Sequence, residues 1–270
     1  MTATRAATKP DGARRHDAGM IRADRLLVAR GLAPTRSAAQ RLIDGGAVRW
    51  RGAHGWARTH KAGERLPESC EIEVCDDAEL RFVSRGGLKL EHALARSGID
   101  ATGLACLDLG QSTGGFTDCL LRAGAAHVVG VDVGHAQLHE SLRADPRVRP
   151  IEGLNVRALD AAALGGDCPH GGFDLVVADL SFISLAHALA PAFALARPGG
   201  RLLALVKPQF ELGPGAVDRR GIVREVSRYA EVRERVERAA RESGWTPEGW
   251  FDSPIAGGDG NREFFLEARK

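Results

Sequence analysis

The chain has 270 residues, 44% hydrophobic and 27% charged, which are ordinary values for a globular protein with room for one large and one small domain. No apolar run approaches the length needed to span a bilayer, and the N-terminus lacks the apolar core of a signal peptide. The five cysteines are odd in number and form no Cys-x-x-Cys pair, which argues against a disulfide framework or a zinc site and fits a reducing cytoplasm.

The net charge of +2 is distributed unevenly along the chain. Residues 1–65 contain 14 Lys and Arg against 5 Asp and Glu, whereas residues 66–270 contain 23 against 30. A basic region joined to an acidic one indicates that the basic region binds a polyanion. The alternative, which the charge distribution alone does not exclude, is that the basic residues form a solvent-exposed surface with no binding partner.

Three parts are expected along the chain. Residues 1–20 mix Thr, Ala, Arg, Lys, Pro and Gly without an apolar period, which predicts a disordered basic tail. Residues 21–80 predict a small α+β domain, and residues 81–270 predict a larger α/β domain.

Two short helices are predicted in the small domain. The first ends at Gly31, and the second spans residues 38–44 after a cap at Thr35 or Ser37. A strand at residues 47–50 closes the unit.

Three stretches of this region resemble the small RNA-binding domain of ribosomal protein S4: Leu26-Leu27, Thr35-Arg36-Ser37 and Leu42-Ile43-Asp44-Gly45-Gly46-Ala47-Val48. The resemblance implies RNA binding by arginines at the helices and turns, namely Arg25, Arg36, Arg41 and Arg49, to which we add Arg85 of the large domain. The usual Val-Asn-Gly hairpin is replaced by Trp50-Arg51-Gly52 and by residues 53–61, which are rich in His, Trp and Arg. A helical accessory domain with a solvated basic face is the alternative.

The junction of the two domains contains a glycine turn. Residues 63–74 predict a further pair of strands, and Asp76-Asp77 marks the link. Ser84-Arg85-Gly86-Gly87 then leads into a helix at residues 89–97. Lys89 lies at the start of that helix, where a lone lysine is usually just solvated.

The large domain alternates between strand and helix patterns. The expected strands are residues 105–109, 127–131, 148–152, 175–178, 201–206, 246–252 and 263–268, and the expected helices include residues 117–123, 184–196 and 227–244. Buried parallel strands covered by helices produce this alternation. We therefore expect a Rossmann-like sheet of about seven strands, the last one antiparallel.

A glycine-rich turn follows the strand at residues 105–109. Its residues are Asp108, Gly110, Ser112, Thr113, Gly114, Gly115 and Phe116. The turn opens onto a helix N-terminus with free N–H groups, and Asp132 ends the next strand, where a carboxylate can hold ribose hydroxyls. The dinucleotide fingerprint Gly-x-Gly-x-x-Gly is not met. The turn resembles instead the first loop of S-adenosylmethionine (SAM)-dependent methyltransferases; a glycine turn in an ordinary α/β domain is the alternative.

Polar residues stand at the ends of four later strands. Asn155 follows the third strand, where an adenine amino group would lie, and Asp179 and Lys207 follow the fourth and fifth. Glu263 opens the last strand. Ligands bind at the carboxyl ends of strands in open α/β sheets, although each residue alone is equally explained as a cap or a surface pair.

Lys89, Asp179, Lys207 and Glu263 occur in the order of the catalytic tetrad of RNA ribose 2′-O-methyltransferases. Four stretches carry a closer resemblance, to the TlyA (hemolysin A) family, from about Arg22 to the end: residues 84–90, 108–116, 178–184 and 206–211. This resemblance implies an FtsJ-like enzyme that methylates cytidine riboses in 16S or 23S ribosomal RNA, with the tetrad as its catalytic residues. It also implies SAM binding by Asp108, Gly110, Ser112, Thr113, Gly114, Gly115, Phe116, Asp132, Asn155 and Asp179, no metal, and ribosomal RNA or a ribosomal subunit as partner.

Methylation of a ribose needs a base, because a 2′-hydroxyl is a poor nucleophile at neutral pH. Lys207 is the residue we expect to take the proton. A second cation such as Lys89 would lower its pKa, while Asp179 and Glu263 would raise it, and the residues alone do not decide between them. The rival hypotheses are a non-catalytic RNA-binding assembly factor, a small-molecule methyltransferase and a membrane-lysing protein. The sequence contains no membrane-spanning or strongly amphipathic apolar helix, which argues against a membrane-lysing protein.

Overall fold

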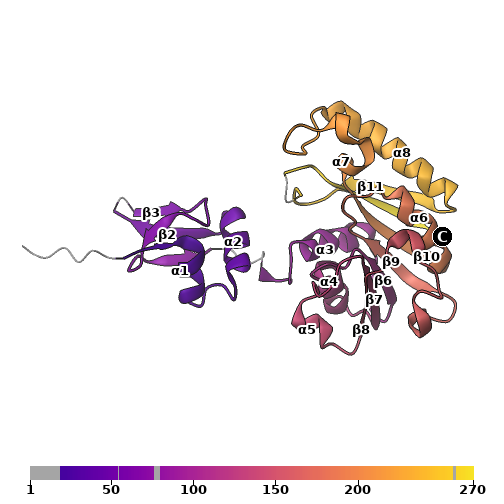
Figure 1. Ribbon diagram of the computed structural model, residues 1–270, viewed down its shortest axis with the longest axis horizontal. Coiled ribbons are helices and arrows are strands. Elements are labelled where there is room, and N and C mark those ends of the chain that lie inside the picture. The colour runs from indigo at the N-terminus through magenta and orange to yellow at the C-terminus, as the bar shows by residue number, and fades with distance from the viewer. Residues whose placement is uncertain (1–18, 54, 76–79, 258–259) are drawn as a thin grey trace, which may run out of the picture. The chain divides into compact units, whose positions relative to one another are not determined.

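The computed structural model describes residues 19–53, 55–75, 80–257 and 260–270 and divides into two compact units, one ending at Leu80 and the other beginning at Arg81 (Figure 1). The predicted tail lies outside the described residues except for its last two positions, and so does the predicted link at Asp76-Asp77. Met20, assigned to that tail, instead opens a short strand, β1 (Met20–Arg22).

The first unit packs two helices, α1 (Ala23–Ala29) and α2 (Arg36–Asp44), beside short strands. Thr35 caps α2 by accepting a hydrogen bond from the Ala38 amide at 3.1 Å, so the helix begins earlier than predicted. The apolar sides of both helices form the core of the unit, which includes Leu26, Leu27, Leu42, Ile43 and Leu66.

Strand pairing in this unit differs from the expectation for residues 63–74. The region contains two strands, β4 (Arg65–Pro67) and β5 (Ile72–Val74), but they do not pair with each other. Strand β4 pairs with β1, whereas β5 pairs with β2 (Val48–Gly52), which also pairs with β3 (Gly55–Arg58). A local pattern marks a strand without selecting its partner, and here β4 pairs with β1 while its Leu66 is buried in the core of the unit.

The second unit contains a seven-stranded sheet, which confirms the predicted fold class. Its strands are β6 (Ala105–Leu109), β7 (His127–Asp132), β8 (Val148–Glu152), β9 (Phe173–Ala178), β10 (Ala196–Val206), β11 (Thr246–Asp252) and β12 (Phe264–Arg269). The order is β11-β12-β10-β9-β6-β7-β8, and β12 runs antiparallel to both of its neighbours.

Helices cover both faces of this sheet. They are α3 (Gly86–Ser97), α4 (Gly115–Arg122), α5 (Glu140–Arg143), α6 (Ala186–Leu195), α7 (Pro208–Leu212) and α8 (Tyr229–Glu242). Alternate strand residues enter two separate cores: Leu107 and Val129 pack with residues of α6 and α8, while Cys106 and Val128 pack with residues of α3 and α4. The period-two pattern of the strands therefore builds a layer of helices on each side.

The sheet order reverses direction at β6. Strand β6 pairs with β7 on one side and with β9 on the other, so successive crossovers lead away from β6 in opposite directions. Such a switch point opens a crevice beyond the carboxyl ends of the strands, where doubly wound α/β proteins bind ligands. Most of the predicted site residues stand in the segments that leave these ends.

Candidate cofactor and catalytic site

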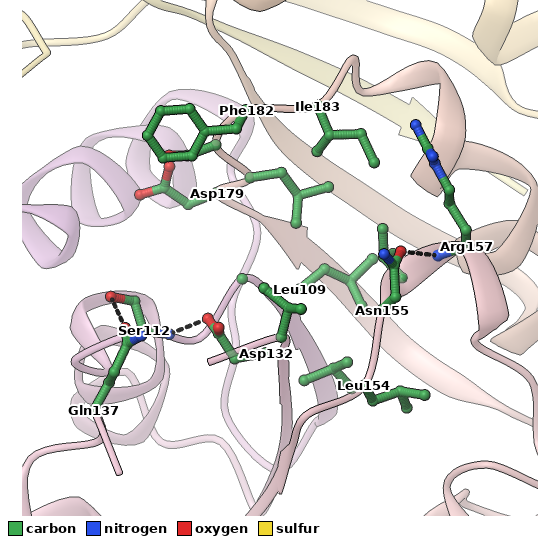
Figure 2. Close-up of a pocket in the computed structure, with 16 residues that line it drawn as sticks. Leu109, Ser112, Asp132, Gln137, Leu154, Asn155, Arg157, Asp179, Phe182 and Ile183 are labelled. Carbon is green, nitrogen blue, oxygen red and sulfur yellow. Dashed lines mark hydrogen bonds between the residues drawn. The ribbon is translucent and has the colours of Figure 1, made fainter. Parts of the chain in front are cut away.

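A cavity of about 500 Å³ lies at the switch point (Figure 2). It is lined by segments that follow β6, β7, β8 and β9. Five residues predicted to bind a cofactor line it: Gly110, Ser112, Asp132, Asn155 and Asp179. The sheet topology therefore brings together side chains that are far apart in the sequence.

Asp132 fastens the glycine loop to the end of β7. One carboxylate oxygen accepts the Ser112 amide at 2.7 Å, and the other accepts the Gly134 amide at 2.7 Å. Ser112 has a left-handed backbone, φ 47°, and its hydroxyl bonds Gln137 at 3.2 Å. Figure 2 shows the bonds of Ser112 to Asp132 and Gln137 at one side of the cavity. A carboxylate oxygen has a second lone pair, so Asp132 can still accept hydroxyls from a ligand.

Two positions of the loop require glycine, because neighbouring parts of the chain lie too close for a side chain. At Gly110, φ is 85° and a Cβ would lie 2.5 Å from the Asp179 carbonyl oxygen. At Gly115, a Cβ would lie 2.2 Å from the Ser84 hydroxyl. The first glycine lets the segments after β6 and β9 touch, and the second lets α4 begin against the turn before α3. Gly114, at φ 93°, is the residue from which α4 starts.

Asp108 lies beneath the loop and does not line the cavity. Its side chain is buried, accepts the Thr117 hydroxyl at 2.7 Å, and has a second oxygen without a hydrogen-bond partner among the described residues. Burial raises the pKa of Asp108 to about 7, against the opposing effect of the Thr117 hydrogen bond. Gln111 extends the network by donating to Thr117 at 2.9 Å. Asp108 thus supports the loop from below, a different place from the ligand contact we expected.

A second cavity of about 140 Å³ shares Gly110, Ser112, Asp179 and Ser181 with the first one and extends to Lys207. Thr113, Gly115 and Phe116 also line it. Phe116 itself is almost fully buried and stacks on Phe265, with ring centroids 6.3 Å apart, so most of its surface belongs to the core.

Asn155 stands at the opposite side of the larger cavity from the loop (Figure 2). Its side-chain oxygen accepts the Arg157 amide at 3.0 Å and caps the short 3₁₀ helix Val156–Ala158. The oxygen retains one lone pair for a ligand donor, so the assignment to an adenine amino group stays a prediction.

The four residues of the predicted tetrad form two ion pairs. The Lys89 ammonium donates to Glu263 at 2.6 Å, and the Lys207 ammonium lies 2.6 Å from the Asp179 carboxylate. Lys207 also donates to the Ser181 hydroxyl at 2.9 Å. Each lysine thus has a carboxylate as its nearest charge.

The Lys89–Glu263 pair is the more deeply buried of the two. Its side chains are 8% and 2% exposed, against 12% and 23% for Lys207 and Asp179. Burial raises the pKa of Glu263, while Lys89 and, more weakly, Lys207 oppose the rise. Because Lys207 and Asp179 both act on Glu263, the four charges belong to one electrostatic group.

A buried carboxylate that our sequence reasoning missed holds the segment after β9. Glu211 of α7 accepts the Ser184 hydroxyl at 2.6 Å and the Leu185 amide at 2.7 Å. It thereby joins α7, which follows Lys207, to the start of α6, which follows Asp179. The signal was present in the sequence, because Glu211 closes residues 206–211, one of the stretches that resemble the TlyA family.

Phe182 is a second residue that the sequence assignment omitted. The residue is 92% exposed at the edge of the cavity, its φ is 64°, and its ring centroid lies 5.4 Å from that of Phe210. A left-handed backbone is costly for an aromatic residue, and such conformations gather at functional sites.

The arginines predicted to bind RNA have varied surroundings. Arg36 bonds the buried Asp24 at 2.9 Å, and Arg22 together with Arg36 holds the pKa of that carboxyl far below its usual range. Arg49 pairs with Glu73 and lies 4.8 Å from the ring centre of Trp56. Arg25 is exposed, and Arg41 and Arg85 are half-buried, Arg85 at the N-cap of α3. Arg36 therefore stabilises its own unit, whatever else it contacts.

The described residues contain no group of three or more His, Cys, Asp or Glu side chains that could hold a metal ion. Within the same residues, no helix has the length and apolar character needed to cross a membrane.

The sheet, the glycine loop and the acidic end of β7 together define a Rossmann-like methyltransferase, joined to a small α+β unit. Family comparisons agree: an FtsJ-like methyltransferase model matches residues 82–270 and an S4 domain model matches residues 21–49. The chain therefore belongs to the FtsJ-like methyltransferases, in their TlyA group, as the sequence predicted.

Its relatives include the 16S/23S rRNA (cytidine-2′-O)-methyltransferase TlyA of Mycobacterium tuberculosis, 45% identical over 92% of this chain and 89% of the relative. Hemolysin A of Brachyspira hyodysenteriae is 34% identical over 90% of this chain and 98% of its own. A hemolysin candidate of known structure from Streptococcus thermophilus is 40% identical, with a TM-score of 0.71 over 94% of this chain and 89% of its own.

Proposed function

We propose that this protein methylates the 2′-hydroxyl of a ribose in ribosomal RNA, at a cytidine of the 16S or 23S molecule, with SAM as methyl donor and the cytoplasm as its compartment. The observation that carries the proposal is the contact of Lys207, which lines the smaller cavity, with Asp179, which lines both cavities, in a chain of the TlyA group that also holds the buried Lys89–Glu263 pair.

The larger cavity suits SAM by its size and its polar groups. It offers the glycine loop, the Asp132 carboxylate for ribose hydroxyls and the Asn155 side-chain oxygen for an adenine amino group. Gly110 lets this loop lie against the segment after β9, since a side chain there would collide with the Asp179 carbonyl oxygen. When bound, SAM supplies a methyl group on a positively charged sulfur.

Lys207 is the group that receives the ribose proton in this proposal. It stands at the end of β10, lines the smaller cavity and contacts Asp179 and Ser181, which fix the direction of its amine. As the ribose oxygen forms its bond to the methyl carbon and the sulfur–carbon bond breaks, the hydroxyl proton moves to Lys207. The amine must be neutral to accept it, so a turnover includes loss of a proton from Lys207 to solvent.

Lys89 and Glu263 act on this step through position and charge. Glu263 neutralises Lys89, which would otherwise be a buried unpaired cation. When active-site residues align the methyl carbon with the attacking oxygen, the activation barrier falls by up to roughly 7–11 kcal/mol in favourable cases.

Phe182 and Phe210 present aromatic surface at the edge of the cavity, where an unstacked base can pack against a ring. A ribose in a folded RNA has to leave its helix to reach Lys207, at a cost of a few kcal/mol. The small unit, with its S4 domain match, supplies phosphate contacts that offset this cost.

The rival functions fit the observations less well. An assembly factor without catalysis has no need of a complete set of paired charges, and a small-molecule methyltransferase leaves the S4 domain unexplained. A membrane-lysing role draws only on the name of a relative.

The decisive experiment is mass spectrometry of nucleosides from ribosomal subunits incubated with enzyme and SAM. We expect 2′-O-methylcytidine with the native chain and none with Lys207→Ala, whose SAM affinity should remain native by calorimetry. Lys207→Arg is the matched control for charge, because a guanidinium stays protonated and should also be inactive. Methylation by either variant at a rate close to native would remove Lys207 from the proposed role.

A further inference from the structure

The segment between α7 and α8 forms a small hairpin with two arginines at its tip. Val217 and Val223 form an antiparallel bridge, and the Asp218 amide donates to the Ile222 carbonyl at 2.8 Å. The Gly221 amide donates to the Asp218 carbonyl at 3.0 Å, which closes a turn around Arg219 and Arg220. We call residues 217–223 the arginine hairpin.

The acidic residue of the hairpin is occupied by its own backbone. Asp218 accepts the Arg220 amide at 2.8 Å and the Ile222 amide at 3.0 Å, and these bonds lower its pKa. Arg220 lies 3.7 Å from the same carboxylate, with 81% of its side chain exposed. Arg219 and Arg224 are exposed as well. The hairpin therefore presents cationic side chains to solvent while its carboxylate shapes the turn.

A buried asparagine ties the hairpin to the catalytic end of the sheet. Asn261 is 1% exposed, accepts the Val223 amide at 2.9 Å and donates to the Gly221 carbonyl at 2.8 Å. It stands two positions before Glu263, and the hairpin itself follows α7, which begins directly after Lys207. The loops after α7 and after β11 lie at the same edge of the unit in Figure 1.

We propose that the arginine hairpin binds the RNA backbone beside the target ribose, through phosphate contacts of Arg219 and Arg220. This inference rests on the proposed function. Residues 81–270 contain 24 Asp and Glu against 23 Lys and Arg, so this unit has no net positive charge and RNA approaches it where cations gather locally. The guanidinium fork matches two phosphate oxygens at once, and a hairpin already held by Asn261 loses little freedom on binding.

The location gives the hairpin a further role. A 2′-hydroxyl is separated from the 3′-phosphate of its own nucleotide by only a few bonds, so a held phosphate also restricts the position of the hydroxyl. An RNA-binding element attached to the chain beside Lys207 and Glu263 therefore sets which ribose enters, whereas the phosphate contacts of the small unit supply general affinity.

The test compares Arg219→Ala/Arg220→Ala with a control, Arg238→Ala/Arg241→Ala, that removes the same charge from exposed positions of α8. Binding to ribosomal subunits and methylation kinetics are measured across a salt series, and SAM affinity by calorimetry. We expect the hairpin variant to raise KM for the subunit at least tenfold, with native SAM affinity and a kcat near native. The slope of log affinity against log salt should become shallower by roughly 0.7–0.9 for each phosphate that the variant no longer neutralises. Arg219→Lys/Arg220→Lys should restore most of that slope.

A hairpin variant that matches the α8 control in KM and in salt slope would overturn the inference. The outcome is separable from the proposed function, because binding to the subunit is read without turnover. If the native chain binds subunits but methylates no ribose, the proposed function fails, and the salt slopes of the two variants still decide whether the hairpin contacts RNA.

Discussion

Removal of Lys89 tests the buried ion pair that joins α3 to the last strand. Lys89→Met keeps much of the side-chain length but removes the cation that lies 2.6 Å from the Glu263 carboxylate. Glu263 is 2% exposed in its side chain, so water cannot replace the missing partner without opening the site. The variant therefore contains a buried carboxylate with no ammonium beside it.

The expected cost follows from that geometry. Breaking a buried pair by removing one partner costs about 3–5 kcal/mol, because the remaining charge is left uncompensated. For a domain of this size, 1 kcal/mol corresponds to roughly 2–4 °C in Tm, so the transition of the methyltransferase unit should fall by about 6–20 °C. Lys89→Met/Glu263→Gln should recover most of the loss, since neither side chain then carries a charge.

The loss should depend on pH in a defined direction. Burial places the pKa of Glu263 above its usual value, and Lys89 opposes that rise, so its removal raises the pKa further. A raised folded-state pKa contributes stability below the unfolded pKa, and the contribution disappears as pH rises through the folded value. The Tm difference between native chain and Lys89→Met should therefore be small near pH 4.5 and grow toward pH 8.

Scanning calorimetry of the native chain, the single variant and the double variant at four or five pH values provides the measurement. Equal Tm values for Lys89→Met and the native chain at pH 8, or a difference that does not change with pH, would refute the buried pair. The same result would also weaken the electrostatic group described for the catalytic site.

Further predictions concern the loop, the segment after β9 and the basic unit. Asp132→Ala should weaken SAM binding at least tenfold, about 1.4 kcal/mol, in calorimetry, and unchanged affinity would remove Asp132 from the cofactor site. Since the pKa of Asp108 is raised to about 7, its contribution to stability should decline as pH rises through that value; Asp108→Asn should abolish this decline in a Tm–pH series, and an unaltered series would contradict the burial described. Glu211→Ala should lower both kcat and Tm, because it releases the segment that carries Ser184. Glu211→Gln can still accept both hydrogen bonds and should lose less of each; equal losses in the two variants would argue against a structural role of these hydrogen bonds. Deletion of residues 1–65 should flatten the salt dependence of RNA binding and leave SAM affinity intact, and a native slope would exclude the delivery role of this region.

The sequence by itself determined the layout of the large unit. The predicted limits of β6, β8 and β11 match the observed ones. Strand β6 is central, and its consecutive buried residues mark a strand covered on both faces, whereas β8 and β11 are the edge strands of the sheet. The sequence also indicated the loop that lines the cavities, since a strand pattern, the glycines Gly110 and Gly115 and a helix pattern follow one another in the chain. These features are local, so the residues that encode them are neighbours in the chain.

Only the tertiary structure decided which charged side chains pair with each other. Lys89 pairs with Glu263 across 174 positions and Lys207 pairs with Asp179, an arrangement set by the order of strands in the sheet. Asp108 lies under the loop, rather than in the cavity, for the same reason: it belongs to a central strand with neighbours on both sides. Periodicity in a sequence reports which residues are buried, whereas contacts between distant segments depend on how whole elements pack, and no local pattern encodes that packing.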